Sequence, residues 1–165
     1  MELEELVQRV GQALVLSRCF LITAESCTGG GVGQALTAVA GSSRWYDRGF
    51  ITYSDRAKVE VLGVSPTTLA LSGAVSEPIA LEMARGALAG CEGSRLALAV
   101  TGIAGPDGGT QAKPVGTVCF AWVRYDGCER VVSRHFCGDR AFVRQQAVVV
   151  ALRGVLEILP ARDDG

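Results

Sequence analysis

The stretch CFLITAESCTGGGVGQAL, residues 19–36, begins as an apolar run and then changes abruptly to a carboxylate, three small polar or thiol side chains and a series of glycines. Its first part, residues 19–24, predicts a buried strand, and the apolar spacing over about residues 32–39 predicts a helix. A strand that leads through a glycine-rich turn into a helix is typical of α/β folds, in which the two elements pack as neighbouring layers. This stretch therefore sets the expected fold class.

The same alternation continues on both sides of that stretch. An amphipathic helix is expected before it, and seven elements are expected after it. The expected elements are a helix over 3–14, a strand at 50–54, a short helix within 55–63, a helix at 76–90, a buried strand at 95–102, two strands at 115–125 and 129–137, and a helix over 139–159. Helical crossovers imply parallel strands, and Asp126–Gly127 favours an antiparallel hairpin. The sequence thus predicts a three-layer α/β/α sandwich with a mixed, largely parallel sheet, in one domain spanning residues 1–165.

The balance of charges excludes several classes of partner. The chain carries 16 Lys and Arg against 17 Asp and Glu, a net charge of −1. Proteins that hold nucleic acid or anionic membranes by electrostatics carry a positive surplus. We therefore expect no nucleic-acid partner and no membrane. The acidic, amphipathic start of the sequence and the lack of a long apolar run favour the cytoplasm.

The six cysteines do not form a recognisable framework. They are widely spaced in a chain in which hydrophobic residues make up 48% of the sequence, and no CxxC pair occurs. Proteins stabilised by disulfides or structural zinc are usually small, and their cysteines are closely spaced in the sequence. We expect most of the cysteines to be small buried thiols, and we expect no metal site.

Ser26 is the first candidate for chemistry. It lies where the predicted strand ends and the glycines begin, and exposed N–H groups at a helix start can stabilise developing negative charge. The alternative is that Ser26 and Thr28 only cap the helix while the glycines allow a tight turn. The glycines complete neither a dinucleotide fingerprint nor a P-loop, and no G-x-S-x-G elbow is present.

The second candidate is TYSDRAK, residues 52–58, in which Tyr53 and Ser54 are expected to end a strand and Lys58 to lie near the start of a helix. A lysine can activate a serine if its ammonium is destabilised. The positive end of the helix and the like charge of Arg56 act in that direction, and burial must supply the rest. The alternative is an ordinary solvated lysine.

The third candidate is GDRAFVRQ, residues 138–145, in which Asp139 is the expected N-cap and Arg140 and Arg144 lie one turn apart. Cations are disfavoured at a helix N-terminus, so two arginines there suggest a bound anion, for which phosphate is the obvious choice. The alternative is a solvated face on which Asp139 offsets Arg140.

The sequence contains, in this order, the motifs TAESCTGG, GSSRWYDRGFITYSDRAK, GAVSEP, TGIAGPDGG, KPVGTV and GDR. Together, and in family order over about residues 3–159, they resemble the CinA C-terminal domain family, the nicotinamide-nucleotide amidases. The resemblance implies hydrolysis of the carboxamide of nicotinamide mononucleotide to nicotinate mononucleotide and ammonia. This reaction returns a by-product of NAD consumption to the cofactor pool. The resemblance also implies a metal-independent serine amidase without a cofactor, and it suggests a homo-oligomer.

By this resemblance Ser26 takes the position of the nucleophile, and Tyr53 and Lys58 take those of the residues that activate it. Chemistry is consistent with that assignment, because a neutral Lys58, directly or through the Tyr53 hydroxyl, can accept the serine proton. The expected substrate-binding residues are Cys27, Thr28, Gly29 and Gly30 through loop N–H groups, Thr101 and Gly102 at a strand end, and Arg140 and Arg144 for the phosphate.

Two other functions compete with the serine amidase. A thiol hydrolase would use Cys27 with His135, the only histidine. A noncatalytic nucleotide-binding or regulatory module would use the glycine loops and the helix-end arginines without turnover.

Overall fold

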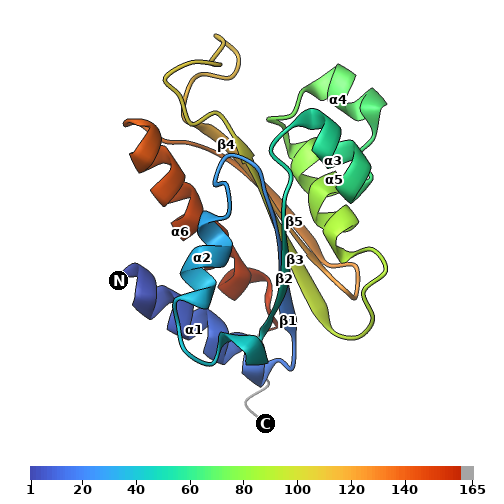
Figure 1. Cartoon of the computed structure of the whole chain (residues 1–165), viewed down its shortest axis with the longest axis vertical. Coiled ribbons are helices and arrows are strands. Elements are labelled where there is room, and N and C mark those ends of the chain that lie inside the picture. The colour runs from blue at the N-terminus through green and yellow to red at the C-terminus, as the bar shows by residue number, and fades with distance from the viewer. Residues whose placement is uncertain (161–165) are drawn as a thin grey trace.

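The computed structural model describes residues 1–160, and it arranges them as a sheet covered by helices on both faces (Figure 1). The helices are α1 (Leu3–Leu16), α2 (Gly31–Thr37), α3 (Asp55–Leu62), α4 (Pro66–Ser72), α5 (Glu77–Leu88) and α6 (Arg140–Ile158), with a 3₁₀ turn at Ser42–Arg44. The strands are β1 (Phe20–Glu25), β2 (Tyr46–Ile51), β3 (Arg95–Gly102), β4 (Thr117–Arg124) and β5 (Glu129–His135).

The sheet has the order β2-β1-β3-β4-β5. Strand β1 pairs in parallel with β2 and with β3, and the β3–β4 and β4–β5 pairs are antiparallel. The expected mixed sheet and α/β/α layering are therefore confirmed. Helices α1, α2 and α6 cover one face, and α3, α4 and α5 lie on the other (Figure 1).

The two faces of the sheet are packed by side chains of different size. Leu98, Phe120 and Trp122 point toward α1, α2 and α6, whereas Ala99 and Ala121 point toward α5. Side chains alternate between the faces of a strand, so a run such as RLALAV supplies both layers. The small residues let α5 approach the sheet closely. Among residues 1–160, no helix is both long and apolar enough to cross a membrane.

The sequence-based element boundaries were wrong in two places. Strand β2 begins at Tyr46 and ends at Ile51, whereas a strand at 50–54 was expected. It is an edge strand with a largely exposed surface, so the Asp-Arg-Gly segment within it lacks the apolar pattern of a buried strand. Helix α4 was not expected at all, although Ser65 caps it and Pro66 occupies its first turn. It has only seven residues and buries none of them.

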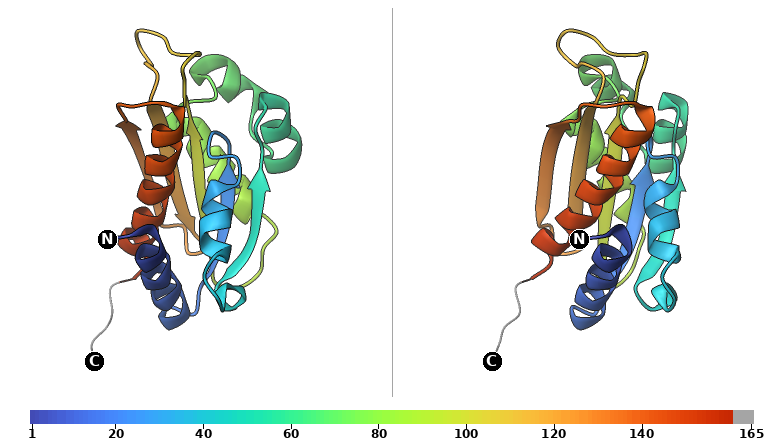
Figure 2. Two further views of the ribbon diagram at one scale, coloured as in Figure 1. Left: turned by 60° about the vertical axis from the view of Figure 1, so that its left-hand side comes forward. Right: turned by 90° about the vertical axis from the view of Figure 1, so that its left-hand side faces the viewer.

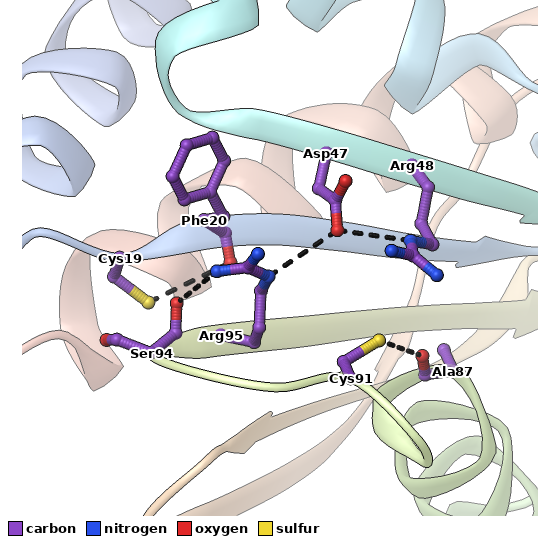
Figure 3. Close-up of polar contacts among 8 residues, drawn as sticks. All are labelled: Cys19, Phe20, Asp47, Arg48, Ala87, Cys91, Ser94 and Arg95. Carbon is purple, nitrogen blue, oxygen red and sulfur yellow. Dashed lines mark hydrogen bonds and ion pairs between the residues drawn. The ribbon is translucent and has the colours of Figure 1, made fainter.

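The three parallel strands, β1, β2 and β3, place their carboxyl ends at the same end of the sheet. The loop after β1, the starts of α3 and α6 and the long segment 103–116 all gather at the upper end in Figure 2. At the opposite end, Arg95 at the start of β3 pairs with Asp47 of β2, with 3.4 Å between Nε and Oδ2, and stacks on the ring of Phe20 (Figure 3). This contact ties together the first residues of three neighbouring strands.

Candidate active site

Ser26 stands on a tightly turned loop, residues 26–30, that we call the nucleophile loop. Its N–H donates to the carbonyl of Val100 on β3 at 2.9 Å, and its own carbonyl accepts from the N–H of Gly29 at 3.0 Å. Gly29 and Gly30 have φ of 58° and 99°, in the left-handed region that favours glycine. The glycines therefore let the chain reverse immediately after Ser26 and enter α2.

Lys58 reaches this loop from the first half of α3. Its Nζ donates to Ser26 Oγ at 2.9 Å and to the main-chain carbonyls of Thr52 and Tyr53, each at 3.0 Å. The side chain is 1% exposed. Burial lowers the pKa of Lys58 below its ordinary value, against the smaller opposing effect of the Asp55 carboxylate. The structure thus joins a serine hydroxyl to a desolvated lysine, although 32 residues separate them in the sequence.

The hydrogen-bonding capacity of a neutral lysine fits this environment. An uncharged amine has two N–H donors and one lone pair. The carbonyls of Thr52 and Tyr53 can take the two N–H groups, which leaves the lone pair for the hydroxyl proton of Ser26. The other nearby acceptor for that hydroxyl is the Tyr53 carbonyl at 3.4 Å, which is a poor base. The arrangement can therefore generate a serine nucleophile at Ser26.

Tyr53 lies beside the pair, but its side chain points elsewhere. Tyr53 follows β2 in the link to α3, so the expectation that it ends a strand was wrong. Its hydroxyl accepts from Nη2 of Arg140 at 3.3 Å, and 62% of the residue is exposed. In residues 1–160 the hydroxyl has no hydrogen bond to Ser26 or Lys58, so it is the main-chain carbonyl of Tyr53 that touches the lysine.

The two arginines of α6 approach the same edge of the sheet. Asp139 caps the helix by accepting from the N–H of Phe142 at 2.9 Å, as expected. Arg140 donates from Nη1 to the carbonyl of Gly105 at 2.8 Å, which places its guanidinium between segment 103–116 and Tyr53. Arg144 instead donates to the carbonyls of Cys27 and Thr28 in the nucleophile loop. The two arginines therefore have different surroundings.

Glu25 is a site residue to which sequence reasoning gave no role. Its carboxylate accepts from Thr28 Oγ1 at 2.6 Å and from the N–H groups of Val32 and Gly33 at 2.9 and 3.1 Å. Helix α2 has Gly30 at its N-cap and no side-chain cap there. The alternative in which Ser26 and Thr28 only cap the helix is thus wrong, because Glu25 fills that role from the preceding strand. A carboxylate that ends a buried apolar strand was the only signal in the sequence.

The sequence matches the family model of the CinA C-terminal domain over residues 3–159. The chain belongs to the CinA C-terminal domain family. The nicotinamide-nucleotide amidohydrolase PncC of Escherichia coli K12 is 51% identical over 153 residues, which cover 92% of each chain. The protein of the same name from Pseudomonas putida is 49% identical over 155 residues, 93% of this chain and 94% of its own. A crystal structure of a competence-damaged protein (CinA) superfamily protein from Escherichia coli has a TM-score of 0.89 at 40% identity, covering 96% of this chain and 91% of its own.

The remaining CinA motif residues lie around the nucleophile loop at different depths. Thr101 is buried, and its hydroxyl donates to the carbonyl of Ala74 at 2.9 Å, so it ties β3 to the segment before α5. Gly102 lies against the loop itself, because a Cβ there would come within 3.1 Å of the Cys27 sulfur and 2.7 Å of Val118. A larger residue at 102 would therefore press on the residue next to Ser26.

The residues of the alternative thiol hydrolase are not brought together in this CinA family member. Burial raises the pKa of the Cys27 thiol to about 12, which disfavours the thiolate needed for attack. His135 is on β5, and two strands lie between it and β1. At about 4.8 Å per strand this is about 14 Å of sheet. The ring Nε2 of His135 instead lies 2.9 Å from the carbonyl of Val115.

Proposed function

We propose that this CinA family member is a nicotinamide-nucleotide amidase. It hydrolyses the carboxamide of nicotinamide mononucleotide to nicotinate mononucleotide and ammonia, and so returns the nucleotide to NAD synthesis. The observation that carries the proposal is the buried amine of Lys58 at 2.9 Å from Ser26 Oγ. The choice of substrate is supported by relatives named for this activity that are about half identical over nine-tenths of both chains.

The reaction begins with proton transfer between these two side chains. Neutral Lys58 accepts the proton of Ser26 Oγ, and the resulting alkoxide attacks the carboxamide carbon. The ammonium of Lys58, held by the carbonyls of Thr52 and Tyr53, then donates its proton to the departing nitrogen. The C–N bond breaks, ammonia leaves, and the nicotinoyl group remains as an ester of Ser26.

The second half of the reaction uses the same base. Neutral Lys58 takes a proton from water, whose hydroxide equivalent attacks the ester carbon. As the C–O bond to Ser26 breaks, the proton passes from Lys58 to Ser26 Oγ, and the carboxylic acid that leaves gives its own proton to water and becomes the carboxylate. Negative charge develops on the carbonyl oxygen in both halves. The N–H groups of Cys27 and Thr28 can stabilise it, because they follow Ser26 directly and bond to no main-chain carbonyl within residues 1–160.

The phosphate of the substrate is assigned to Arg140. Its guanidinium uses two donors on Gly105 and Tyr53 and keeps the others for an anion. It is near the exposed ring of Tyr53 at the edge of the sheet that carries Ser26. This arrangement gives Tyr53 two functions, a main-chain acceptor for Lys58 and a hydroxyl that orients Arg140. Direct transfer to Lys58 is accordingly the proposed route for the serine proton.

Ammonia release from nicotinamide mononucleotide tests the proposal. We expect turnover by the wild-type protein and by Cys27→Ala, and a loss of several orders of magnitude in Ser26→Ala. Nicotinamide riboside, which lacks the phosphate, is expected to react with a higher KM. If the wild-type protein releases no ammonia, or Ser26→Ala retains full activity, the proposed function is wrong.

The same experiment separates the two competing functions. Binding of the mononucleotide in a calorimeter without any turnover would favour the noncatalytic module. Loss of activity in both Cys27→Ser and His135→Ala, with unchanged melting temperatures, would favour the thiol hydrolase. Self-association and a cytoplasmic location stay predictions from the sequence.

A further inference from the structure

The nucleophile loop is held on one side by the buried carboxylate of Glu25. Oε1 accepts from both Thr28 Oγ1 and the N–H of Val32, and Oε2 accepts from the N–H of Gly33. The residue is 2% exposed. These three hydrogen bonds fix where the loop leaves Ser26 and where α2 starts. Glu25 thus accepts from the N–H groups of Val32 and Gly33 at the start of α2, and it accepts from neither the N–H of Cys27 nor that of Thr28.

On the other side the loop is held by the guanidinium of Arg144. Nε donates to the carbonyl of Cys27 at 3.1 Å and Nη2 donates to the carbonyl of Thr28 at 3.2 Å. A trans peptide is planar, with its C=O and N–H directed oppositely. Because the Cys27 carbonyl points to Arg144, the N–H of Thr28 must point away from it. The arginine therefore sets the orientation of a donor that it does not touch.

Two further N–H groups beside these contacts also have partners. The N–H of Gly29 bonds to the Ser26 carbonyl, and that of Gly31, the first residue of α2, bonds to the Thr28 carbonyl. Within residues 1–160 the N–H groups of Cys27, Thr28 and Gly30 bond to no main-chain carbonyl, and the first two belong to the residues that directly follow the serine. Two charged side chains, 119 positions apart in the sequence, thus engage the polar groups around this pair and leave the pair itself open.

We propose that Glu25 and Arg144 are positioning residues, which hold the N–H groups of Cys27 and Thr28 in place to stabilise the oxyanion. This inference rests on the proposed function and gives Arg144 a role other than the phosphate contact expected from the sequence. A positioned donor acts on the transition state more than on the bound substrate, so its loss lowers kcat rather than raising KM.

Conservative substitutions test this with little change of volume. In Glu25→Gln an NH2 group replaces one carboxylate oxygen and must face an N–H or O–H donor. In Arg144→Lys one ammonium replaces a planar fork that reaches two carbonyls. The matched controls are Glu82→Gln, where the carboxylate accepts from the N–H of Ser65 at another helix start, and Arg153→Lys, an exposed position on α6.

We expect kcat for nicotinamide mononucleotide to fall about 10- to 100-fold in both test variants, with KM within about twofold of wild type. Hydrogen exchange of peptides covering residues 26–33 is expected to be about tenfold faster than in wild type, with no change in either control. The melting temperature is measured for each variant. If Glu25→Gln fails to fold, Arg144→Lys alone decides the question.

Two results would overturn the inference. One is a raised KM with unchanged kcat in Arg144→Lys, which would make the arginine a substrate contact. The other is wild-type hydrogen exchange of residues 26–33 in the test variants. The exchange measurement needs no turnover. A wild-type protein that releases no ammonia would therefore refute the proposed function, while exchange would still decide whether the two charges hold the loop.

Discussion

Replacing Lys58 with methionine should nearly abolish catalysis without emptying the space that the lysine fills. Methionine occupies a similar volume but has no basic nitrogen. Within the part of the chain that the structure describes, the only other acceptor near Ser26 Oγ is the Tyr53 carbonyl at 3.4 Å, which cannot hold a proton at neutral pH. General-base catalysis is worth about 10²- to 10⁴-fold in rate. We therefore expect kcat/KM to fall by that factor, or by about 3–5.5 kcal/mol in transition-state stabilisation.

The lowered pKa of Lys58 also predicts the direction in which activity changes with pH. Burial lowers the pKa of Lys58, and the amine can accept the serine proton only when it is uncharged. Activity of the wild-type protein should rise as pH increases toward that lowered pKa and then level off. Lys58→Met should lack the rise over the same interval, as should Lys58→Arg, because guanidinium stays charged at all accessible pH values.

The sequence offers a clean control for both measurements. Lys58 and Lys113 are the only lysines, and Lys113 binds the Ser72 carbonyl on α4 instead of the serine. Lys113→Met should keep its kcat/KM and its pH profile. In Lys113→Arg a single lysine remains, so the ¹³Cε resonance of Lys58 reports its pKa directly by NMR. An ordinary pKa near 10.4, or more than a tenth of wild-type activity in Lys58→Met, would refute the reasoning.

Three further outcomes follow from the same contacts. In Arg140→Ala, loss of a charge-assisted hydrogen bond to phosphate, worth about 1.5–3 kcal/mol, should raise KM about 10- to 100-fold with little change in kcat, and steady-state kinetics checks both values. Tyr53→Phe keeps the carbonyl that binds Lys58 and loses only the hydroxyl beside Arg140, so kcat should fall less than about tenfold; a loss as large as that of Lys58→Met would restore the hydroxyl as a proton relay. Between the lowered pKa of folded Lys58 and the ordinary value of the unfolded chain, the unfolded state binds more protons, so the free energy of unfolding should rise with pH in the wild type relative to Lys58→Met, as denaturant titrations at alkaline pH would show.

The layers of the fold could be predicted from sequence because buried strands and helix boundaries have local causes. The run RLALAV supplies side chains to both faces of a strand, and Ser76 with Pro78 marks the start of α5. Strand β2 was misplaced because its side chains face solvent, so no apolar pattern identifies Asp47–Gly49 as strand. Its pairing with β1 comes from main-chain hydrogen bonds, which residue identity hardly influences.

The same holds for the candidate site. The sequence could predict the roles that depend on side-chain chemistry, but not the roles that depend on the path of the main chain. Ser26 and Lys58 were identified as candidates by residue type and by their places at a strand end and a helix start. The roles of Glu25 and Arg144 depend on where main-chain groups point, and the Arg144–Cys27 contact spans 117 residues. The contribution of Tyr53 to Lys58 is a carbonyl, which any residue could supply. Sequence patterns contain no signal for such contacts.

The Ser26–Lys58 distance is ultimately set by the register of two strands. Glu25 pairs with Ile51 at the end of the β1–β2 ladder, and the N–H of Thr52 donates to the Glu25 carbonyl at 2.9 Å. Thr52 and Tyr53 carry the two carbonyls that hold the lysine, and Ser54 then caps α3. Because side chains alternate along a strand, a shift of β2 by one residue would turn this whole segment away from Ser26. The β1–β2 ladder is irregular between Leu21 and Ile22, beside the Asp47–Arg95 ion pair (Figure 3), so it is the regular pairing from Ile22 to Glu25 that holds this segment in register with Ser26.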